Sequence, residues 1–470
     1  MSPASQHMPY SWSAEGPISQ KALLTHAAIV ASELPDCRYV VNLCEDRYLF
    51  SVGFLASLRR GQVTLLPPGR ENSSVLEAVA GFGEYYVLFD RGVTPPEGRA
   101  HYFLDYFPIR GGGAGPAFSD WVEDPGKPAI VAFTSGSTGV PQPYPKTWRS
   151  LTDSTRLALQ RFGLSGHHMV ATVPPQHMYG LECTVLYPLL GHMAVHAGRP
   201  FFPEDIRSAL ESLPVPRVLV TSPLHLRTCL GVGFKWPRMD LVISATASLP
   251  HSIATEVEHG WGTRVREIYG CTETGAIASR DTTVSDRWVL YNGMRLEMRQ
   301  SVAYVRGPQL DKDTRLPDVI RRIDDTRFEL VGRATDQINV AGKRTSLAEL
   351  NNKLLAIDGV EDGVVIMCDS GDVGPVVRPV ALVVAPSLDE TRLRARLGEV
   401  MPAIFVPRPI YLVPSLPRTP TGKLRRDALL ALLNALRQNP MVSKQAKSSS
   451  SVAAGAIGPK AWKTRAKATE

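Results

Sequence analysis

The sequence predicts an α/β protein with a large N-terminal domain built on parallel-rich sheets and a small α+β C-terminal domain. At 470 residues the chain is too long for one compact core. Short apolar, β-branched runs alternate with longer helix-like stretches through the first 330 residues, a pattern typical of a largely parallel sheet. The pattern changes after about Gly332, which favours a second, smaller domain.

The strands predicted for the large domain each end in a small or polar loop. They cover residues 129–134, 169–173, 217–221, 241–245 and 264–269. Ligands of open α/β sheets bind at the carboxyl ends of the strands, so these loops are where the chemistry is expected.

The small domain is predicted to mix helices and strands. We expect helices over residues 346–356 and 388–400 and strands over residues 363–368 and 379–385. The domains are placed at residues 1–332 and 333–438, and residues 439–470, rich in Ser, Ala and Lys, are expected to form a disordered basic tail.

The distribution of charge argues against a nucleic-acid binder. Residues from 443 onward carry +5 of the formal net charge of +7, which leaves a nearly balanced body without zinc-finger spacing. The six cysteines form no Cys-x-x-Cys pair, which predicts reduced thiols in a cytoplasm. The sequence contains no export signal and no run of 18 apolar residues, so we expect no membrane span.

The loop TSGSTG follows the predicted strand at 129–134 and is suited to a polyphosphate. Its hydroxyls and closely spaced backbone N–H groups can converge on an anion, because glycine permits the conformations required. It is not a Walker loop, since the Gly-Lys-Ser/Thr ending is missing and prolines at 141, 143 and 145 disfavour a following helix. Taken alone, it is equally well a solvent-exposed turn. The loop residues are Thr134, Ser135, Gly136, Ser137, Thr138 and Gly139.

Four further segments follow in order. They are PPQHMYG (174–180), YGCTETG (269–275), Asp318 placed 14 residues before Gly332, and LPRTPTGKLRR (416–426). Each has an ordinary alternative when taken alone, such as a strand-end turn, a charged strand or a solvated lysine. Together they resemble the AMP-forming adenylate superfamily of acyl-CoA synthetases, aryl-acid ligases and luciferases, and the resemblance covers roughly residues 38–430.

The resemblance implies ATP as the nucleotide and assigns residues to it. Tyr269 would lie near adenine and Asp318 would accept both ribose hydroxyls, which suits a carboxylate because it can take two hydrogen bonds at once. In addition to the six loop residues, the nucleotide-binding set is Ala245, Thr246, Tyr269, Gly270, Asp318 and Arg333.

The resemblance also assigns the chemistry. Thr272 would contact the α-phosphate, Glu273 would hold Mg²⁺, and Lys423 would reach the substrate carboxylate and the α-phosphate. No protein nucleophile is required, because the acid is activated as a mixed anhydride with AMP. The acyl pocket is assigned to His177, Tyr179, Gly180 and Ser222.

The implied activity has two steps. An acyl-adenylate forms with release of pyrophosphate, and the acyl group then passes to the phosphopantetheine thiol of an acyl carrier protein or of CoA. Between the steps the small, mobile domain would rotate about a hinge after Gly332. Two positions depart from the family pattern: Gln142 replaces the lysine of Pro-Lys-Gly, so that the nearest lysine is Lys146, and Thr335 stands where relatives carry Asp or Lys.

The compact N-terminal part and the Gln-Pro continuation of the loop resemble one branch of this family. The enzymes of this branch are encoded together with aryl polyene and xanthomonadin-type pigment pathways, and they load 4-hydroxybenzoate or a related aryl acid onto an acyl carrier protein. A fatty or short-chain acyl-CoA synthetase is the alternative within the enzyme class. A nucleotide-binding homologue with impaired catalysis is the alternative from another class, motivated by Gln142 and Thr335.

Overall fold

The computed structural model describes residues 8–106, 118, 121–135, 141–333, 337–340, 343–367, 379–418 and 424–438. The chain divides into two compact units. The first comprises the residues up to Asn352 together with Arg418–Arg425, and the second comprises Lys353–Pro417 and the residues from Arg426 onward. The residues predicted as a basic tail, 439–470, lie outside the described part.

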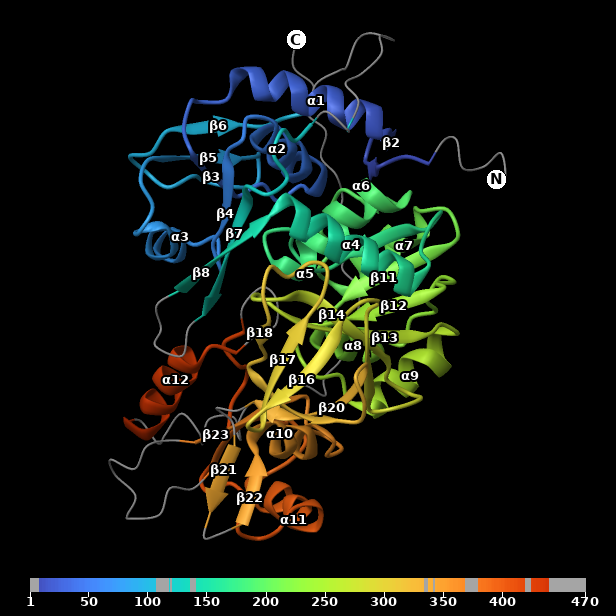
Figure 1. Cartoon of the computed structure of the whole chain (residues 1–470). Helices are drawn as coiled ribbons and strands as arrows, with labels where there is room; N and C mark the ends of the chain where they lie inside the picture. Colours follow the sequence, from blue (N-terminus) through green and yellow to red (C-terminus); the bar gives the residue numbers. More distant parts are fainter. Residues whose placement is uncertain are drawn as a thin grey trace, which may run out of the picture. The chain divides into compact units, whose positions relative to one another are not determined.

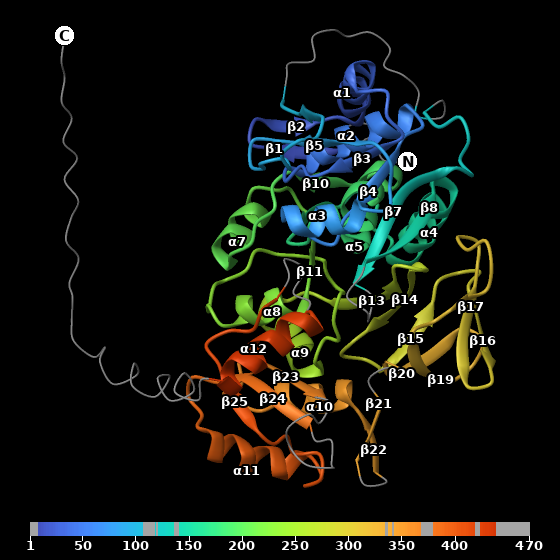
Figure 2. The same ribbon diagram turned by 90° about the vertical axis from the view of Figure 1, so that its left-hand side faces the viewer.

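A six-stranded sheet with the order β6-β5-β3-β4-β7-β8 forms the N-terminal part of the first unit. All neighbouring strands are parallel except β7 and β8, which form an antiparallel hairpin (Figure 1). Helices α1 and α2 cover one face of this sheet and α3 the other (Figures 1 and 2). The elements are β3 (Tyr39–Asn42), β4 (Val63–Leu66), β5 (Tyr85–Phe89), β6 (His101–Phe103), β7 (Pro128–Ser135), β8 (Pro141–Thr147), α1 (Gln20–Glu33), α2 (Arg47–Arg59) and α3 (Asn72–Val79).

An eleven-stranded sheet forms the rest of the first unit's core, in the order β19-β20-β15-β14-β13-β12-β11-β9-β10-β1-β2. The strands from β13 to β1 in this order run parallel, and β2 and the strands from β14 to β19 are antiparallel to their neighbours. The strands are β1 (Ser11–Ser13), β2 (Gly16–Ile18), β9 (His168–Ala171), β10 (Ala194–His196), β11 (Arg217–Thr221), β12 (Leu241–Ser244), β13 (Val265–Cys271), β14 (Gly275–Asp281), β15 (Arg287–Leu290), β19 (Asp318–Arg322) and β20 (Arg327–Arg333).

Helices cover both faces of the parallel half of this sheet, which explains why its strands are apolar on both sides. In β11, Val218 and Val220 pack with α4 and α6, while Leu219 packs with α7, α8 and α9 on the other face. The helices are α4 (Trp148–Phe162), α5 (Met178–Leu181), the π-helical turn η3 (Glu182–Leu186), α6 (Tyr187–Gly191), α7 (Pro203–Glu211), α8 (Pro223–Leu230) and α9 (His251–Trp261). The predicted large α/β domain with parallel-rich sheets is confirmed.

Five short strands complete the first unit. A small antiparallel sheet contains β16 (Arg295–Arg299), β17 (Val302–Arg306) and β18 (Thr314–Arg315), and a hairpin contains β21 (Gln337–Val340) and β22 (Lys343–Ser346).

The second unit contains a three-stranded sheet with helices, visible in orange and red in Figure 2. Helix α12 buries Leu429, Leu433 and Leu436, whose spacing places one apolar stripe toward the core. The elements are β23 (Asp362–Met367), β24 (Pro379–Val384), β25 (Ile410–Leu412), α11 (Glu390–Val400) and α12 (Arg426–Gln438), and α10 (Leu347–Leu355) crosses the division between the units. The predicted α+β composition of the C-terminal domain is confirmed.

Arg47, the first residue of α2, joins the two large sheets. Its side chain is fully buried and donates hydrogen bonds to the carbonyl oxygens of Ala171 (2.9 Å) and Val173 (3.1 Å) and to Oγ1 of Thr184 (2.8 Å). Its backbone N–H donates to the carbonyl of Ala197 at 2.8 Å. The end of β9 is therefore fixed against the start of α2.

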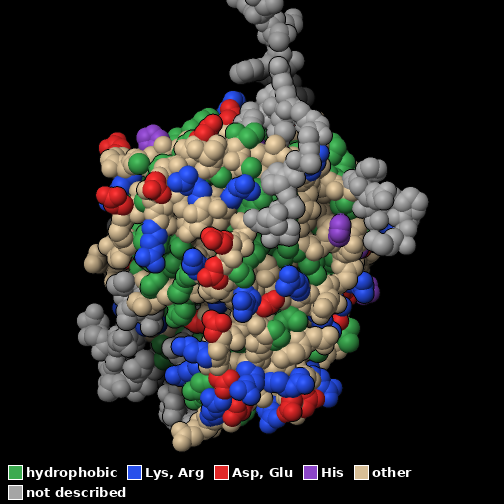
Figure 3. All heavy atoms as spheres, turned by 45° about the horizontal axis from the view of Figure 1, so that its top comes forward, with side chains coloured by type: hydrophobic (Ala, Val, Ile, Leu, Met, Phe, Trp, Pro, Cys, Tyr) green, Lys and Arg blue, Asp and Glu red, His purple; other side chains and the backbone are tan. Residues whose placement is uncertain are grey.

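The surface in Figure 3 carries Lys and Arg side chains interspersed with Asp and Glu rather than gathered into a basic stripe. In the described part of the chain, none of the helices combines the length and the apolar character that crossing a bilayer requires.

Candidate active site

Four of the five strand ends predicted to carry the chemistry lie at one edge of the eleven-stranded sheet, whereas the strand before the predicted phosphate loop, β7, belongs to the six-stranded sheet. Strands β9, β11, β12 and β13 are parallel neighbours, with Ala171 beside Val220 and Thr221 beside Ser244. Their carboxyl ends therefore share one edge, and the segments that follow them contain the predicted acyl-pocket residues, Ala245 and Thr246 of the predicted nucleotide-binding set, and the segment YGCTETG.

The signature YGCTETG forms the end of β13, a tight turn and the start of β14. Oγ1 of Thr274 accepts a hydrogen bond from the backbone N–H of Cys271 at 3.3 Å. Gly275 has φ +68°, and a Cβ atom on Gly270 would lie 2.2 Å from the carbonyl oxygen of Gly275. Both positions require glycine, so the turn that presents Thr272 and Glu273 has a defined shape.

Two of the predicted nucleotide residues are in direct contact. The hydroxyl of Tyr269 donates a hydrogen bond to Oδ2 of Asp318 at 2.7 Å. Tyr269 is 8% exposed and packs against the rings of Trp288 and Phe328, each with its centroid 5.5 Å away. Asp318 is half-buried in β19, directly opposite Arg333 of β20, of which only the backbone is described.

The side chain of Glu273 is half-buried beside two residues of β8. Nζ of Lys146 donates a hydrogen bond to the backbone carbonyl of Glu273. Burial and the neighbouring Glu273 carboxylate raise the pKa of the Tyr144 hydroxyl. Burial, together with the charge of Glu273, raises the pKa of the Cys271 thiol to about 12, so this cysteine stays protonated at neutral pH and is no nucleophile.

Lys146 lies near a second buried charge, the carboxylate of Glu182. Burial lowers the pKa of Lys146 and raises that of Glu182, and each charge favours the ionised form of the other. Glu182 also accepts hydrogen bonds from Oγ of Ser154 (2.9 Å) and from the backbone N–H of Ala276 (3.4 Å).

The predicted acyl-pocket residues lie at the ends of β9 and β11. His177 is half-buried and precedes α5, and a Cβ atom on Gly180 would lie 1.9 Å from the carbonyl oxygen of Pro174. The hydroxyl of Tyr179 donates to the carbonyl oxygens of Thr221 (3.1 Å) and Ile243 (2.9 Å), so this hydroxyl joins the ends of β11 and β12.

Ser222 is 1% exposed, and its Oγ lies 3.0 Å from Nδ1 of His225. Two residues of the predicted nucleotide-binding set, Ala245 and Thr246, follow β12. Ala245 is buried, and Thr246 has φ +80°, a left-handed conformation that is uncommon for a side chain of this kind and is found most often at functional sites.

Several predicted residues lie outside the described part. Gly136, Ser137, Thr138, Gly139 and Lys423 are among them, as is Thr335 of the predicted hinge. For Thr134 and Ser135 the backbone is described: both residues end β7, opposite Gln142 and Pro141 of β8. The predicted phosphate loop thus connects the two strands of this hairpin.

Sequence reasoning missed a polar contact between the two sheets. Nη2 of Arg70 donates to Oε1 of Gln176 at 3.0 Å, and Nε2 of Gln176 donates to the carbonyl of Cys44 at 2.6 Å. Gln176 directly precedes His177, so the contact fixes the segment PPQHMYG, which contains predicted acyl-pocket residues, against the six-stranded sheet. The only sequence signal was the position of Gln176 inside the PPQHMYG segment.

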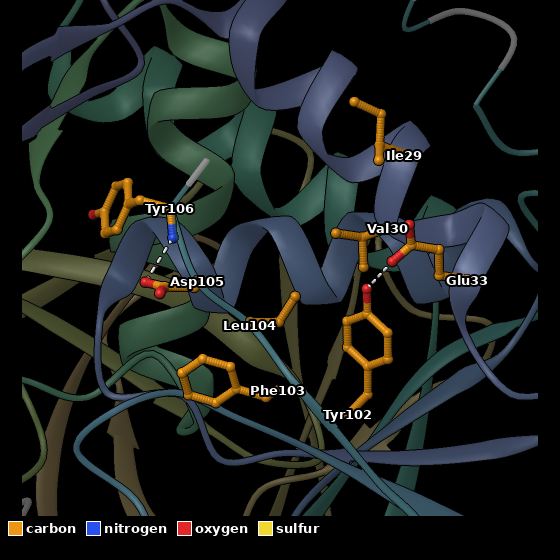
Figure 4. A pocket seen from close by; sticks show the side chains of 8 residues that line it. All are labelled: Ile29, Val30, Glu33, Tyr102, Phe103, Leu104, Asp105 and Tyr106. Atoms are coloured by element: carbon orange, nitrogen blue, oxygen red, sulfur yellow. Dashed lines mark hydrogen bonds between the residues drawn. The ribbon is translucent and has the colours of Figure 1, made fainter. Parts of the chain in front are cut away.

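A cavity of about 330 Å³ lies elsewhere, between α1 and the edge strand β6 (Figure 4). Its lining includes Ile29, Val30 and Phe103, and the hydroxyl of Tyr102 donates to the carboxylate of Glu33. None of the predicted site residues lines this cavity, so it is not the predicted active site.

The residues at the strand ends suit a nucleotide and a magnesium ion. No group of three or more His, Cys, Asp or Glu side chains in the described part of the chain could enclose a metal. Mg²⁺ in phosphate sites is commonly held by one or two carboxylates together with phosphate oxygens and waters, so the single carboxylate of Glu273 is sufficient. The carboxylate of Asp318, beside an aromatic ring, fits a ribose diol and a base.

Comparison with protein families agrees with this geometry. The model described as AMP-binding enzyme matches residues 34–315, and the model of the AMP-binding enzyme C-terminal domain matches residues 349–423. The first match alone covers more than half of the chain. The chain therefore belongs to the family of AMP-binding enzymes.

Curated relatives are similar over parts of the chain. The 4-coumarate–CoA ligase of Rhodobacter capsulatus is 28% identical over 302 residues, which are 63% of this chain and 74% of that protein. Enterobactin synthase component F of Escherichia coli is 23% identical over 368 residues, which are 66% of this chain. The chain spans only 28% of the length of that synthase component.

Solved structures share the fold. MatB from Rhodopseudomonas palustris, solved with ATP bound, has a TM-score of 0.76 at 20% identity, with 92% of this chain and 96% of that chain covered. The anthranilate CoA ligase AuaEII, solved with anthranoyl-AMP, has a TM-score of 0.75 at 16% identity, with the same shares covered.

Proposed function

We propose that this chain is an ATP- and Mg²⁺-dependent acid–thiol ligase. It activates a carboxylic acid as an acyl-adenylate with release of pyrophosphate, and then transfers the acyl group to a phosphopantetheine thiol. The observation that carries the proposal is the contact between Tyr269 and Asp318, 2.7 Å long, three residues from the turn that presents Thr272. In this proposal the ring of Tyr269 and the carboxylate of Asp318 bind the base and the ribose, and Thr272 and Glu273 serve the α-phosphate and magnesium.

In the first step, a carboxylate oxygen of the acid attacks the α-phosphorus of ATP, and the bond to pyrophosphate breaks. Both reactants are anions, so the site has to supply positive charge and N–H donors. In this proposal the loop 134–139 donates N–H groups to the phosphates, Thr272 contacts the α-phosphate, and Lys423 lies between the carboxylate and the α-phosphate. Glu273 would hold Mg²⁺, which when bound would neutralise phosphate charge.

In the second step, the thiol sulfur attacks the carbonyl carbon of the acyl-adenylate, AMP leaves with the bonding electrons, and the thiol proton is released. No described side chain needs to act as a nucleophile in either step.

Our first candidate for the acid is an aryl acid such as 4-hydroxybenzoate. The support is the resemblance of the Gln-Pro loop to the pigment-pathway branch and the similarity to two 4-coumarate–CoA ligases, of Rhodobacter capsulatus and Halorhodospira halophila. An acyl carrier protein is the first candidate for the acceptor, with CoA as the alternative. The reaction belongs to the cytoplasm, where ATP, CoA and carrier proteins are available.

The test is acid-dependent ATP–pyrophosphate exchange, screened over benzoates and fatty acids. We expect exchange with hydroxybenzoates, followed by thioester formation when a phosphopantetheinylated carrier protein or CoA is added. Exchange with fatty acids alone would replace the aryl acid by a fatty acid, and nucleotide binding without exchange for any acid would contradict ligase activity.

The variant Lys423→Ala tests the role of the C-terminal lysine. We expect exchange to fall by at least about 100-fold, because a positioned charge at a developing transition state typically contributes that much. Lys353→Ala, outside the proposed site, is the control. Unchanged exchange in Lys423→Ala would remove this lysine from the mechanism.

A further inference from the structure

The lysine that the family pattern places after the phosphate loop is absent at Gln142, and Lys146 follows four residues later on the same strand. We propose that Lys146 is a positioning residue that binds the main chain at Glu273, so that the Glu273 carboxylate is held ready for Mg²⁺. The inference rests on the proposed function and assigns a role to a residue that the proposal has not used.

The position of Lys146 in β8 directs its side chain toward the turn. Gln142, Tyr144 and Lys146 alternate along the strand and share one face, because side chains two residues apart point the same way. Lys146 is 7% exposed, and its ammonium donates to the carbonyl oxygen of Glu273. An amine withdrawn from water this far requires hydrogen-bond partners inside the protein.

The negative charge of the Glu182 carboxylate stabilises the buried ammonium of Lys146. Its side chain is 4% exposed, lies within electrostatic range of Lys146, and opens the π-helical turn η3, a type of turn that is frequent at functional sites. A Cβ atom on Gly275 would lie 2.8 Å from Oε1 of Glu182, so the carboxylate packs directly against the signature turn. Lys146 and Glu182 therefore contact the YGCTETG turn from the interior of the protein.

The side chain of Gln309 binds the same turn. Nε2 of Gln309 donates to the carbonyl oxygens of Thr274 (3.4 Å) and Ala276 (2.9 Å). Three backbone carbonyls, those of Glu273, Thr274 and Ala276, are thus bound by two side chains that are distant in the sequence, and Lys146 binds the carbonyl of the proposed metal-binding residue itself. Because the Lys146 ammonium is engaged with the protein in this way, it does not substitute at the phosphates for the family's lysine at position 142.

Positioning and direct phosphate binding predict different behaviour. A lysine that contacts phosphate contributes to the affinity for ATP with or without magnesium. A lysine that positions Glu273 contributes only to the gain in affinity that Mg²⁺ produces, because the carboxylate acts through the metal. Residues that orient a metal ligand typically account for a 10- to 100-fold change in metal affinity.

Calorimetric titration with a non-hydrolysable ATP analogue, with and without Mg²⁺, separates the two roles. For Lys146→Met we expect the Mg²⁺-dependent gain in affinity to fall by about tenfold and the affinity for the metal-free analogue to stay within about twofold of the parent. Lys146→Arg, which retains a buried cation and its N–H donors, should recover part of the gain. Lys127→Met removes an exposed lysine and should behave as the parent does.

A second variant guards against a folding defect. Lys146→Met leaves the Glu182 carboxylate buried without its counter-charge, which destabilises a protein strongly. The double variant Lys146→Met/Glu182→Gln removes both charges and keeps a hydrogen-bonding group at 182, and it should show the same loss of the Mg²⁺-dependent gain.

A fall in affinity for the metal-free analogue would overturn the proposal in favour of phosphate contact, and an unchanged Mg²⁺-dependent gain in the folded double variant would overturn it outright. Absence of acid-dependent exchange in the parent would contradict the ligase activity alone, because this binding experiment does not use the acid.

Discussion

At the scale of single residues, the contact between Tyr269 and Asp318 makes the sharpest prediction. Replacing Asp318 with Asn keeps the size of the side chain but removes the negative charge that would accept both ribose hydroxyls. Hydrogen bonds to a charged group contribute about 1.5–3 kcal/mol each, so we expect the KM for ATP to rise about 10- to 100-fold with a smaller change in kcat. The measurement is acid-dependent exchange with ATP and with 2′-deoxy-ATP.

The parent should prefer ATP over the deoxynucleotide, and Asp318→Asn should lose most of that preference. Tyr269→Phe is the companion variant: it keeps the packing against Trp288 and Phe328 but removes the hydroxyl that orients the carboxylate. If Asp318→Asn discriminates between the two nucleotides as the parent does, Asp318 does not bind the ribose.

Local patterns in the sequence predicted where strands end and turns begin, but they did not predict the contacts that residues make with distant partners. The turn after β13 could be predicted because strand ends and glycines are visible in the sequence, whereas the loop ahead of Gln142 lies outside the described residues and stays a prediction. The contacts of Lys146 could not be predicted, because its ammonium interacts with the carboxylate of Glu182 in a π-helical turn and with the carbonyl of Glu273 in another hairpin. Burial of such polar groups depends on tertiary packing, which no local pattern records.

At the scale of elements, the predicted strands and helices agree with the structure to within about two residues at most ends. Continuous apolar runs flanked by turn residues identified β11 and β12, since strands covered on both faces are apolar throughout. The antiparallel half of the large sheet and the turn η3 were not predicted. The pairing of strands and the formation of a π-helical turn depend on contacts between elements, and the periodicity of the sequence gives no information about such contacts.

The start of α5 provides a prediction for one element. In Gly180→Ala the added methyl group would lie 1.9 Å from the carbonyl oxygen of Pro174, so the backbone beside His177 has to move. We expect the free energy of unfolding to fall by about 2 kcal/mol, as overpacking in a dense interior typically costs about 1–3 kcal/mol, and the KM for the acid to rise more than the KM for ATP. Thermal unfolding and exchange kinetics measure both effects.

Gly260→Ala is the matched control. Gly260 lies in α9, and a Cβ atom there would meet no atom within 4 Å. Alanine in an exposed helix position should stabilise the protein by roughly 0.5–1 kcal/mol and leave both KM values unchanged. If the KM for the acid and the free energy of unfolding change equally in the two variants, the close approach of Gly180 to the carbonyl oxygen of Pro174 has no consequence for the acyl pocket.

At the scale of the whole molecule, the division into two compact units bears on the two reactions that we propose for this chain. The first family model matches residues within the first unit, and the second, over residues 349–423, covers Lys353–Pro417 of the second unit together with short segments of the first. Strand β20 ends at Gly332–Arg333, and Gly332 has φ +146°, a conformation that favours glycine. The hinge predicted at Thr335 follows directly, outside the described residues.

Relative motion is the ordinary behaviour of domains joined by a short linker, and hinge residues absorb it as changes in φ and ψ. In Thr335→Pro the ring fixes φ and removes the backbone N–H. We expect ATP–pyrophosphate exchange within about twofold of the parent, and thioester formation from isolated acyl-adenylate slowed by about tenfold or more, because in our proposal only the second step requires the small domain to rotate. Thr335→Ala, which leaves the backbone free, should perform both steps normally. Normal rates for both half-reactions in Thr335→Pro would mean that rotation at this residue is not needed, and that the thiol reaches the adenylate by another route.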